Sequence, residues 1–281
     1  MGFFLYLCTH ILCTCIEKRN TLYIFVSMYN THELIKIGVA RKDIPSTLFK
    51  YYRLDENLLH SIREGYLWFN SFEGYNDPYE GKFNLRNDYT ISEIRRWLPT
   101  EYGLLFPSPD TDELLKKNFP KILRSEIRRK AKEIRVCCFS TKWNDLLMWA
   151  HYADSYKGVC LVFDVAELAD SLSYIQKVHY EEEFDVVDYL HNQQETIVQM
   201  VCTKAKEWEY EDEYRFINTN NTAHKVPIKM SALRAVIIGC KCNKRGKIYK
   251  ELIASLPASV EIIYSIPSVK AYKLCKRSHK V

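Results

Sequence analysis

Two apolar runs separated by a helical pattern most constrain how this chain can fold. The runs "RVCCFS" (135–140) and "VCLVF" (159–163) each have the length and composition of a buried strand. Between them, "NDLLMWAHYAD" repeats apolar residues at helical spacing, with Asn144 or Asp145 as the N-cap and Gly158 as a left-handed C-terminal cap. The sequence therefore predicts a strand–helix–strand unit whose strands lie in the interior.

Strand and helix patterns alternate along the rest of the chain. Strands are predicted over 47–54, 66–72, 213–217, 234–239 and 260–266, and helices over 55–65, most of 90–135, 195–208 and 247–256. The chain contains no internal repeat, low-complexity linker or composition shift that would mark a domain boundary. We therefore expect a single α+β domain over 47–281, with a mixed or split β-sheet and flanking helices.

Residues 1–46 form an atypical N-terminal extension. The first apolar run is too short to span a bilayer, and it lacks the basic start and the cleavage site of a secretory signal. It fits an extra strand pair, a weak membrane anchor, or translated upstream sequence ahead of a start at Met28, and we favour the third. We expect no stable membrane insertion.

Charge and cysteine usage narrow the class of protein. The net charge of +5 is compatible with an anionic ligand but is too small to indicate a nucleic-acid-binding domain by itself. The 10 cysteines form no CxxC pair and lie mostly in apolar runs. This usage favours a reducing, cytoplasmic compartment and does not predict a metal site.

The densest polar cluster is "KEWEYEDEYRF" (206–216). If it is extended, Glu209, Glu211, Glu213 and Arg215 point to one side. Like charges on one face raise the pKa of at least one carboxyl group, which suits acid–base catalysis. The alternative is an exposed strand start in which the arginine relieves the repulsion.

A second cluster, "FNSFEGYNDPYE" (69–80), is rich in turn-forming residues. Asn76, Asp77 and Glu80 offer hydrogen-bond acceptors on a loop, where binding sites are common. Ordinary turn chemistry is the alternative.

A third cluster, "FKYYR" (49–53), places basic and aromatic residues on a strand. Lys50 and Tyr52 share one face, while Tyr51 and Arg53 share the other. An arginine and a tyrosine at a strand edge can hold a phosphate and stack on a base. The alternative is a half-exposed strand.

His151 lies off the apolar stripe of its helix and could face a cleft. No GxGxxG before a helix, GxxxxGK[ST], HExxH or GxSxG motif occurs in the chain. The dinucleotide-fold, P-loop, zincin and α/β-hydrolase classes are therefore disfavoured.

Taken together, these blocks resemble a known bacterial family. "LFKYYR", "GYLWFNSFEGYNDPYE", "CCFSTKWNDLLMWAHYADSYKGVCLVFD", "KEWEYEDEYRF" and "AVIIG" resemble the family named domain of unknown function 2971. The resemblance runs from about residue 47 to 266. Members of this family also resemble proteins found among phage-defence genes, which implies an effector directed at NAD or nucleic acid.

The order of these blocks is more loosely similar to that of ADP-ribosyltransferase-like proteins, which bind NAD in a split-sheet cleft. This resemblance implies that Arg53 or Lys50 holds the pyrophosphate or ribose, and that Tyr66, Phe69 or Ser71 lines the nicotinamide pocket. It also implies that Glu213 stabilises an oxocarbenium-like centre. No Ser-Thr-Ser string of that family is present.

Three functions follow as hypotheses. The first is an ADP-ribosyltransferase or NAD-glycohydrolase with NAD as substrate, Glu213, Glu211 and His151 as catalytic candidates, and a protein or nucleic-acid acceptor. The second is a nuclease in which carboxylates of Asp77, Glu80 and the late glutamates hold Mg²⁺. The third is a non-catalytic module that binds a nucleotide or a protein.

Overall fold

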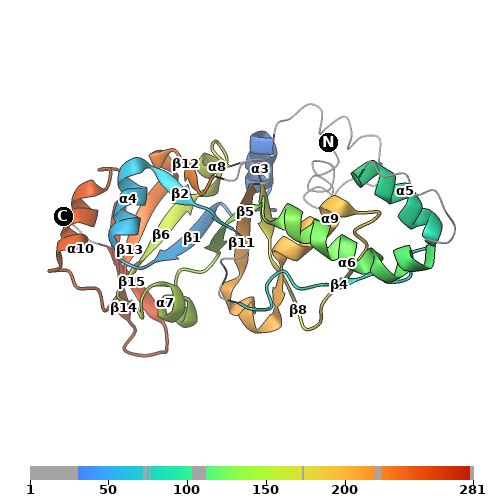
Figure 1. Ribbon diagram of the computed structural model, residues 1–281. Helices are drawn as coiled ribbons and strands as arrows, with labels where there is room; N and C mark the ends of the chain where they lie inside the picture. Colours follow the sequence, from blue (N-terminus) through green and yellow to red (C-terminus); the bar gives the residue numbers. More distant parts are fainter. Residues whose placement is uncertain are drawn as a thin grey trace.

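Nine strands of the described residues form one mixed β-sheet that runs through the molecule (Figure 1). The computed structural model describes residues 31–71, 75, 77–102, 112–172, 174–218 and 223–278. The strand order is β15-β14-β13-β6-β1-β5-β11-β7, and β3 pairs with β5. The strands are β1 (Thr47–Tyr52), β3 (Asn70–Ser71), β5 (Arg135–Ser140), β6 (Val159–Asp164), β7 (Ile175–Lys177), β11 (Glu213–Asn218), β13 (Leu233–Ile238), β14 (Glu261–Pro267) and β15 (Leu274–Ser278).

Helices cover both ends of this sheet (Figure 1). At the end where the chain's C-terminus lies are α4 (Glu56–Glu64) and α10 (Lys247–Ser255). At the opposite end of the molecule are α5 (Ile91–Tyr102), α6 (Asp112–Ala131) and α9 (Gln193–Cys202). The remaining elements are α3 (Thr31–Ala40), α7 (Leu146–Tyr152), α8 (Val165–Leu168), the 3-10 helices η3 (Lys206–Glu211) and η4 (Met230–Ala232), and the strand pairs β2 (Tyr66–Trp68) with β12 (Lys225–Pro227), β4 (Asn84–Leu85) with β9 (Val186–Val187), and β8 (His179–Glu181) with β10 (Thr203–Ala205). The fold is thus single-domain α+β, as the sequence predicts.

The sheet is nearly divided between β1 and β5, at a place we call the seam. Strand β1 pairs with β6 along its whole length, but the register with β5 consists of one pair, Phe49 opposite Ser140. Beyond that pair, the backbone carbonyl of Cys138 accepts a 2.8 Å hydrogen bond from the ammonium group of Lys50. A side chain of β1 therefore satisfies a carbonyl group of β5 beside the seam, where the strands have ceased to pair.

Three hydrophobic clusters hold the layers together. The largest includes Leu48, Phe139 and Phe216 on one face of the sheet. Alternation along β1 sends Phe49 to the opposite face, where it joins a cluster around the fully buried Trp149 of α7. The third cluster packs α5, α6 and α9 against the outer half of the sheet.

Several element predictions are confirmed. Strand β5 has the predicted bounds, and α4 begins at the N-cap Asp55 and ends at Gly65 in the left-handed conformation. The predicted helical region 90–135 contains α5 and α6, and the break near residues 107–110 lies outside the described residues. The predicted strand 66–72 is divided into β2 and β3.

Two predictions are wrong. Helix α7 has Ala153 as its C-cap, and Gly158 lies beyond the turn that follows. Gly158 instead permits close packing of the backbone, because a Cβ atom at this position would lie 2.0 Å from the carbonyl oxygen of Tyr52. The helix predicted over 195–208 ends at Cys202, because the next three residues extend to pair with β8.

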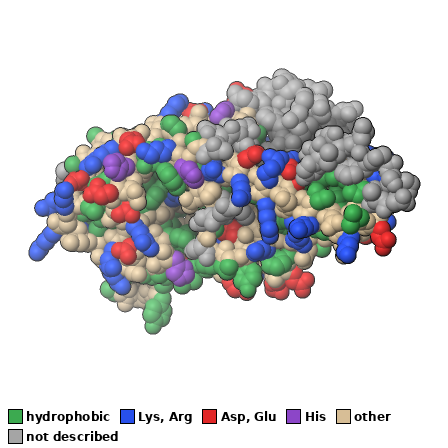
Figure 2. Space-filling model, in the orientation of Figure 1, with side chains coloured by type: hydrophobic (Ala, Val, Ile, Leu, Met, Phe, Trp, Pro, Cys, Tyr) green, Lys and Arg blue, Asp and Glu red, His purple; other side chains and the backbone are tan. Residues whose placement is uncertain are grey.

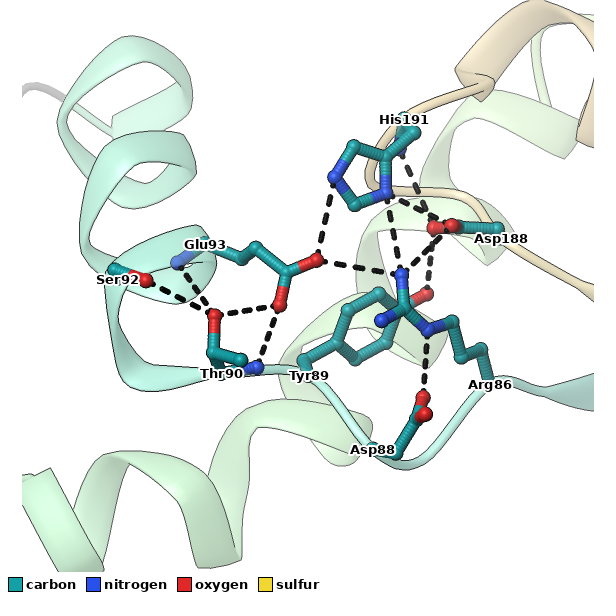
Figure 3. Close-up of polar contacts among 8 residues, drawn as sticks. All are labelled: Arg86, Asp88, Tyr89, Thr90, Ser92, Glu93, Asp188 and His191. Atoms are coloured by element: carbon teal, nitrogen blue, oxygen red, sulfur yellow. Dashed lines mark hydrogen bonds and ion pairs between the residues drawn. The ribbon is translucent and has the colours of Figure 1, made fainter.

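The start of α5 is fixed by a polar network (Figure 3). The hydroxyl of Thr90 accepts from the backbone N–H of Glu93, whose carboxylate accepts from the backbone N–H of Thr90, as in a capping box. Arg86 and His191 join this carboxylate to Asp188, in the segment leading into α9. The network thereby ties α5 to α9.

Helix α3 precedes the expected start of the domain at residue 47. Its Leu34 and Ile35 are buried, and Ile35 belongs to the largest core cluster. Residues 1–30, including the predicted start at Met28, lie outside the described residues. Within the described ranges, no helix combines the length and the apolar character needed to cross a membrane.

Candidate functional site

A cavity of about 240 Å³ lies beside the seam. Its aromatic walls come from both halves of the sheet and from nearby segments: Phe49, Tyr51, Tyr75, Phe139 and Tyr152. Five charged residues also line it: Lys50, Lys204, Glu211, Glu213 and Arg215. We refer to this cavity as the seam pocket.

The innermost charge of the seam pocket is Arg215, whose side chain is fully buried. Its guanidinium donates two parallel hydrogen bonds of 3.0 and 2.9 Å to the carboxylate of Glu213. It also forms an ion pair with Glu80, and it lies 5.2 Å from the centre of the Tyr75 ring. Burial raises the pKa of Glu213, but the nearby cations Arg215 and Lys204 outweigh burial and hold that pKa below its ordinary value.

Glu211 lies in a different environment. Its Oε1 accepts a 2.6 Å hydrogen bond from the Tyr152 hydroxyl, and its Oε2 accepts from the ammonium of Lys204 at 2.5 Å. Burial is the largest influence and raises the pKa of Glu211. The backbone is held as well, because Ser140 Oγ donates to the Glu211 carbonyl and Asp212 turns the chain with a φ of 43°.

Lys204 lies between the two late glutamates. Its Nζ is 2.5 Å from Glu211 and 3.7 Å from Glu213. Burial lowers its pKa, but the surrounding carboxylates outweigh burial and raise that pKa above the ordinary value. Each carboxylate in this buried group therefore faces a cation supplied by the protein.

The third sequence cluster is only partly brought to the seam pocket. Lys50 lines it, although its ammonium is engaged with the Cys138 carbonyl. The hydroxyl of Tyr52 is buried, and Tyr52 does not line the cavity. Arg53 is exposed and does not line it either, so the structure does not bring this arginine together with the late glutamates.

The 69–80 cluster divides in the same way. Glu80 reaches the pocket through Arg215, whereas Asp77 accepts from the backbone N–H of Tyr79 in a turn. Phe69 is buried in the largest core cluster, and Ser71 lies on β3 opposite Arg135. None of Phe69, Ser71, Asp77 or Tyr66 lines the pocket, and Asn76 lies outside the described residues.

His151 precedes Tyr152 on α7. Its Nδ1 is 3.0 Å from the hydroxyl of Tyr210, and its ring contacts Trp208 edge-on. It is exposed and does not line the seam pocket. The extended ladder predicted over 206–216 is also corrected: 206–211 is a 3-10 helix, and the exposed Glu209 pairs with Lys206.

Sequence reasoning missed Tyr152, Lys204, Tyr75 and Ser140. Tyr152 immediately follows His151 in the same sequence block, and that proximity is the signal that could have found it. Lys204 had none, because it lies in a segment that the sequence predicts as helix.

The segment from α7 to β11 supplies most of the charged groups of the pocket. Residues 148–216 match the model of a family described as protein of unknown function (DUF2971). The resemblance to DUF2971 is thereby confirmed for this segment. The DUF2971 segment contains Tyr152, Lys204, Glu211, Glu213 and Arg215. No curated protein and no solved structure matches the chain significantly.

Proposed function

We propose that this protein cleaves the N-ribosyl bond of NAD or a related nucleotide and passes the ADP-ribosyl group to water or to an acceptor. The observation that carries this proposal is the pair of buried glutamates in the seam pocket, whose pKa values are pushed in opposite directions. Such a divergence separates a group that stays ionised from one that exchanges a proton.

The two glutamates then have different roles. Glu213, ionised beside Arg215, stabilises the positive charge that develops on the ribose as the glycosidic bond breaks. The bonding electron pair leaves with the nicotinamide nitrogen. Glu211 accepts the proton of the attacking water or acceptor hydroxyl as the new bond to the ribose carbon forms.

The size of the cavity limits what enters it. A volume of about 240 Å³ is below the roughly 300–1,000 Å³ of pockets that enclose a whole drug-sized ligand. We propose that the nicotinamide riboside end enters between the aromatic walls and that the phosphates stay outside. Lys276, exposed and 5.8 Å from the ring centre of Phe49, is then the candidate phosphate ligand in place of Arg53.

The nuclease alternative has less support. Within the described residues, no group of three or more His, Cys, Asp or Glu side chains is arranged to hold a metal ion.

A non-catalytic nucleotide-binding module is the other alternative, and it would use the same pocket. Only a measurement of NAD turnover distinguishes such a module from an enzyme. An effector that consumes NAD during phage infection is the biological setting that we propose.

The test is release of nicotinamide from NAD by the purified chain, together with calorimetric binding of NAD. We expect turnover that Glu213→Gln reduces at least 100-fold and Glu211→Gln reduces to a similar degree, as for loss of a charge-stabilising or acid–base group (about 10²–10⁴). Glu209→Gln, on the exposed face of the same segment, is the matched control. Binding without turnover would favour the non-catalytic module, and absence of both would reject the proposal.

A further inference from the structure

Helix α6 carries a basic stripe on its exposed face. Seven residues between Lys116 and Arg128 are exposed; five are cationic and none is acidic. The cations are Lys116, Lys117, Lys121, Arg124 and Arg128, and the other two residues are Asn118 and Ser125. Figure 2 shows the resulting row of blue side chains over α6.

The stripe follows the geometry of the helix. Lys117, Lys121, Arg124 and Arg128 are separated by four, three and four residues, so they lie in one line on the face opposite the buried residues. At 1.5 Å per residue the line is about 17 Å long. The buried face, which includes Phe119 and Leu123, fixes the helix against the core.

Nothing in the described part of the chain neutralises this line. No acidic side chain there pairs with Lys117, Lys121, Arg124 or Arg128, whereas the neighbouring Arg129 pairs with Glu126. Like charges three or four residues apart destabilise a helix. The arrangement is therefore locally unfavourable in the isolated protein and becomes favourable against a regularly spaced anion.

Arg124 has an additional contact that fits this role. Its guanidinium lies 5.9 Å from the centre of the Phe83 ring, and the preceding residue, Lys82, is exposed. An aromatic ring beside a guanidinium is a common feature of surfaces on which nucleic-acid strands lie.

We propose that the α6 stripe docks the phosphate backbone of a nucleic acid, without reading its sequence. A linear row of cations on a rigid helix matches a linear polyanion, and affinity from such contacts depends on counterion release rather than on base edges. Helix α6 leads into β5, which carries the pocket residues Cys138 and Ser140. A nucleic acid docked on α6 would therefore lie on the same half of the sheet as Glu211 and Glu213. The inference does not depend on NAD cleavage.

The experiment measures binding of short labelled single-stranded and duplex oligonucleotides to the full chain by fluorescence anisotropy at several salt concentrations. Five phosphate contacts predict a slope of log K against log salt of about −3.5 for the single strand and about −4.5 for the duplex. The triple variant Lys121→Gln, Arg124→Gln, Arg128→Gln should lower these slopes to about −1.4 and −1.8 and weaken binding at least tenfold at about 0.1 M salt.

A control variant of equal charge change separates this docking from general electrostatics. Arg245→Gln, Lys250→Gln and Lys270→Gln remove three exposed cations outside α6 and should leave binding within about twofold of the unaltered chain. Circular dichroism confirms that both triple variants are folded. Equal weakening by the two variants would overturn the proposal, as would binding to anionic phospholipid vesicles but not to either oligonucleotide.

Discussion

The hydroxyl of Tyr152 donates a 2.6 Å hydrogen bond to Oε1 of Glu211, across 59 residues of sequence. This contact joins α7, at the centre of the strand–helix–strand unit, to the acidic segment before β11. Together with Lys204 on the other oxygen, it holds the carboxylate from both sides. The contact is therefore a long-range one within the DUF2971 segment, and it fixes one of the charged groups of the pocket.

Removal of the Tyr152 hydroxyl should change how Glu211 titrates. The hydrogen bond favours the ionised carboxylate, so Tyr152→Phe should raise the already elevated pKa of Glu211 further. A rise of one unit reduces the ionised fraction about tenfold below the pKa. Carboxyl carbon shifts of labelled Glu211, followed by NMR against pH, measure the change directly. Tyr156→Phe, which loses a hydrogen bond to the Leu146 carbonyl, should leave the titration unaltered.

Arg215 should be essential for stability. Arg215→Met removes the buried cation that pairs with both Glu213 and Glu80, and we expect a loss of about 3–5 kcal/mol in the free energy of unfolding. Urea denaturation measures it. Arg63→Met, which breaks the more exposed pair with Glu251, should cost less than about 1 kcal/mol. A similar loss for both variants would contradict the buried network.

Acid should destabilise the protein in part through Glu213. Its folded-state pKa lies below 4.5, so its contribution is present above that pH and is lost as pH falls through the folded value. Glu213→Gln should therefore be less stable at neutral pH and lose less stability on acidification below pH 4.5. Unfolding free energies measured across this range test the sign. Equal acid slopes for Glu213→Gln and the exposed-site variant Glu209→Gln would refute the assignment.

Gly158 should not tolerate a side chain. The Cβ of alanine would lie 2.0 Å from the Tyr52 carbonyl oxygen and 3.0 Å from that of Ala153, both backbone atoms that cannot rotate away. We expect Gly158→Ala to cost about 3 kcal/mol. Gly65→Ala meets its nearest atom at 3.6 Å and should cost only about 1 kcal/mol for the left-handed backbone. Thermal unfolding of the two variants decides between these outcomes.

Local sequence patterns predict many of the elements but not the seam. The apolar run 135–140 and the cap Asp55 act through neighbouring residues, so strand β5 and helix α4 followed from the sequence. The looser resemblance predicts that Arg53 or Lys50, the 69–80 loop and the late glutamates converge on one cleft. The structure brings Lys50, Glu80, Glu211, Glu213 and Arg215 together, but not Arg53. Arg53 does not reach the pocket because β1 ends at Tyr52, so Arg53 lies beyond the strand whose Phe49 and Tyr51 line the cavity.

Lys204 could not be placed from sequence because its conformation is decided by distant partners. The segment after Cys202 has helical periodicity, yet pairing with β8 and the attraction of two carboxylates extend it. The single residue pair between β1 and β5 has no local signal either, because the sequence of each strand alone has the pattern of a normally paired strand.

That single pair has a mechanical consequence. Few backbone bonds resist parting of the two halves there, so amide protons beside Phe49 and Ser140 should exchange with solvent sooner than those between β1 and β6. A ligand in the seam pocket would contact residues of both β1 and β5 and so link the two halves of the sheet. Ligand binding would then stiffen the sheet at the point where these two strands share a single residue pair.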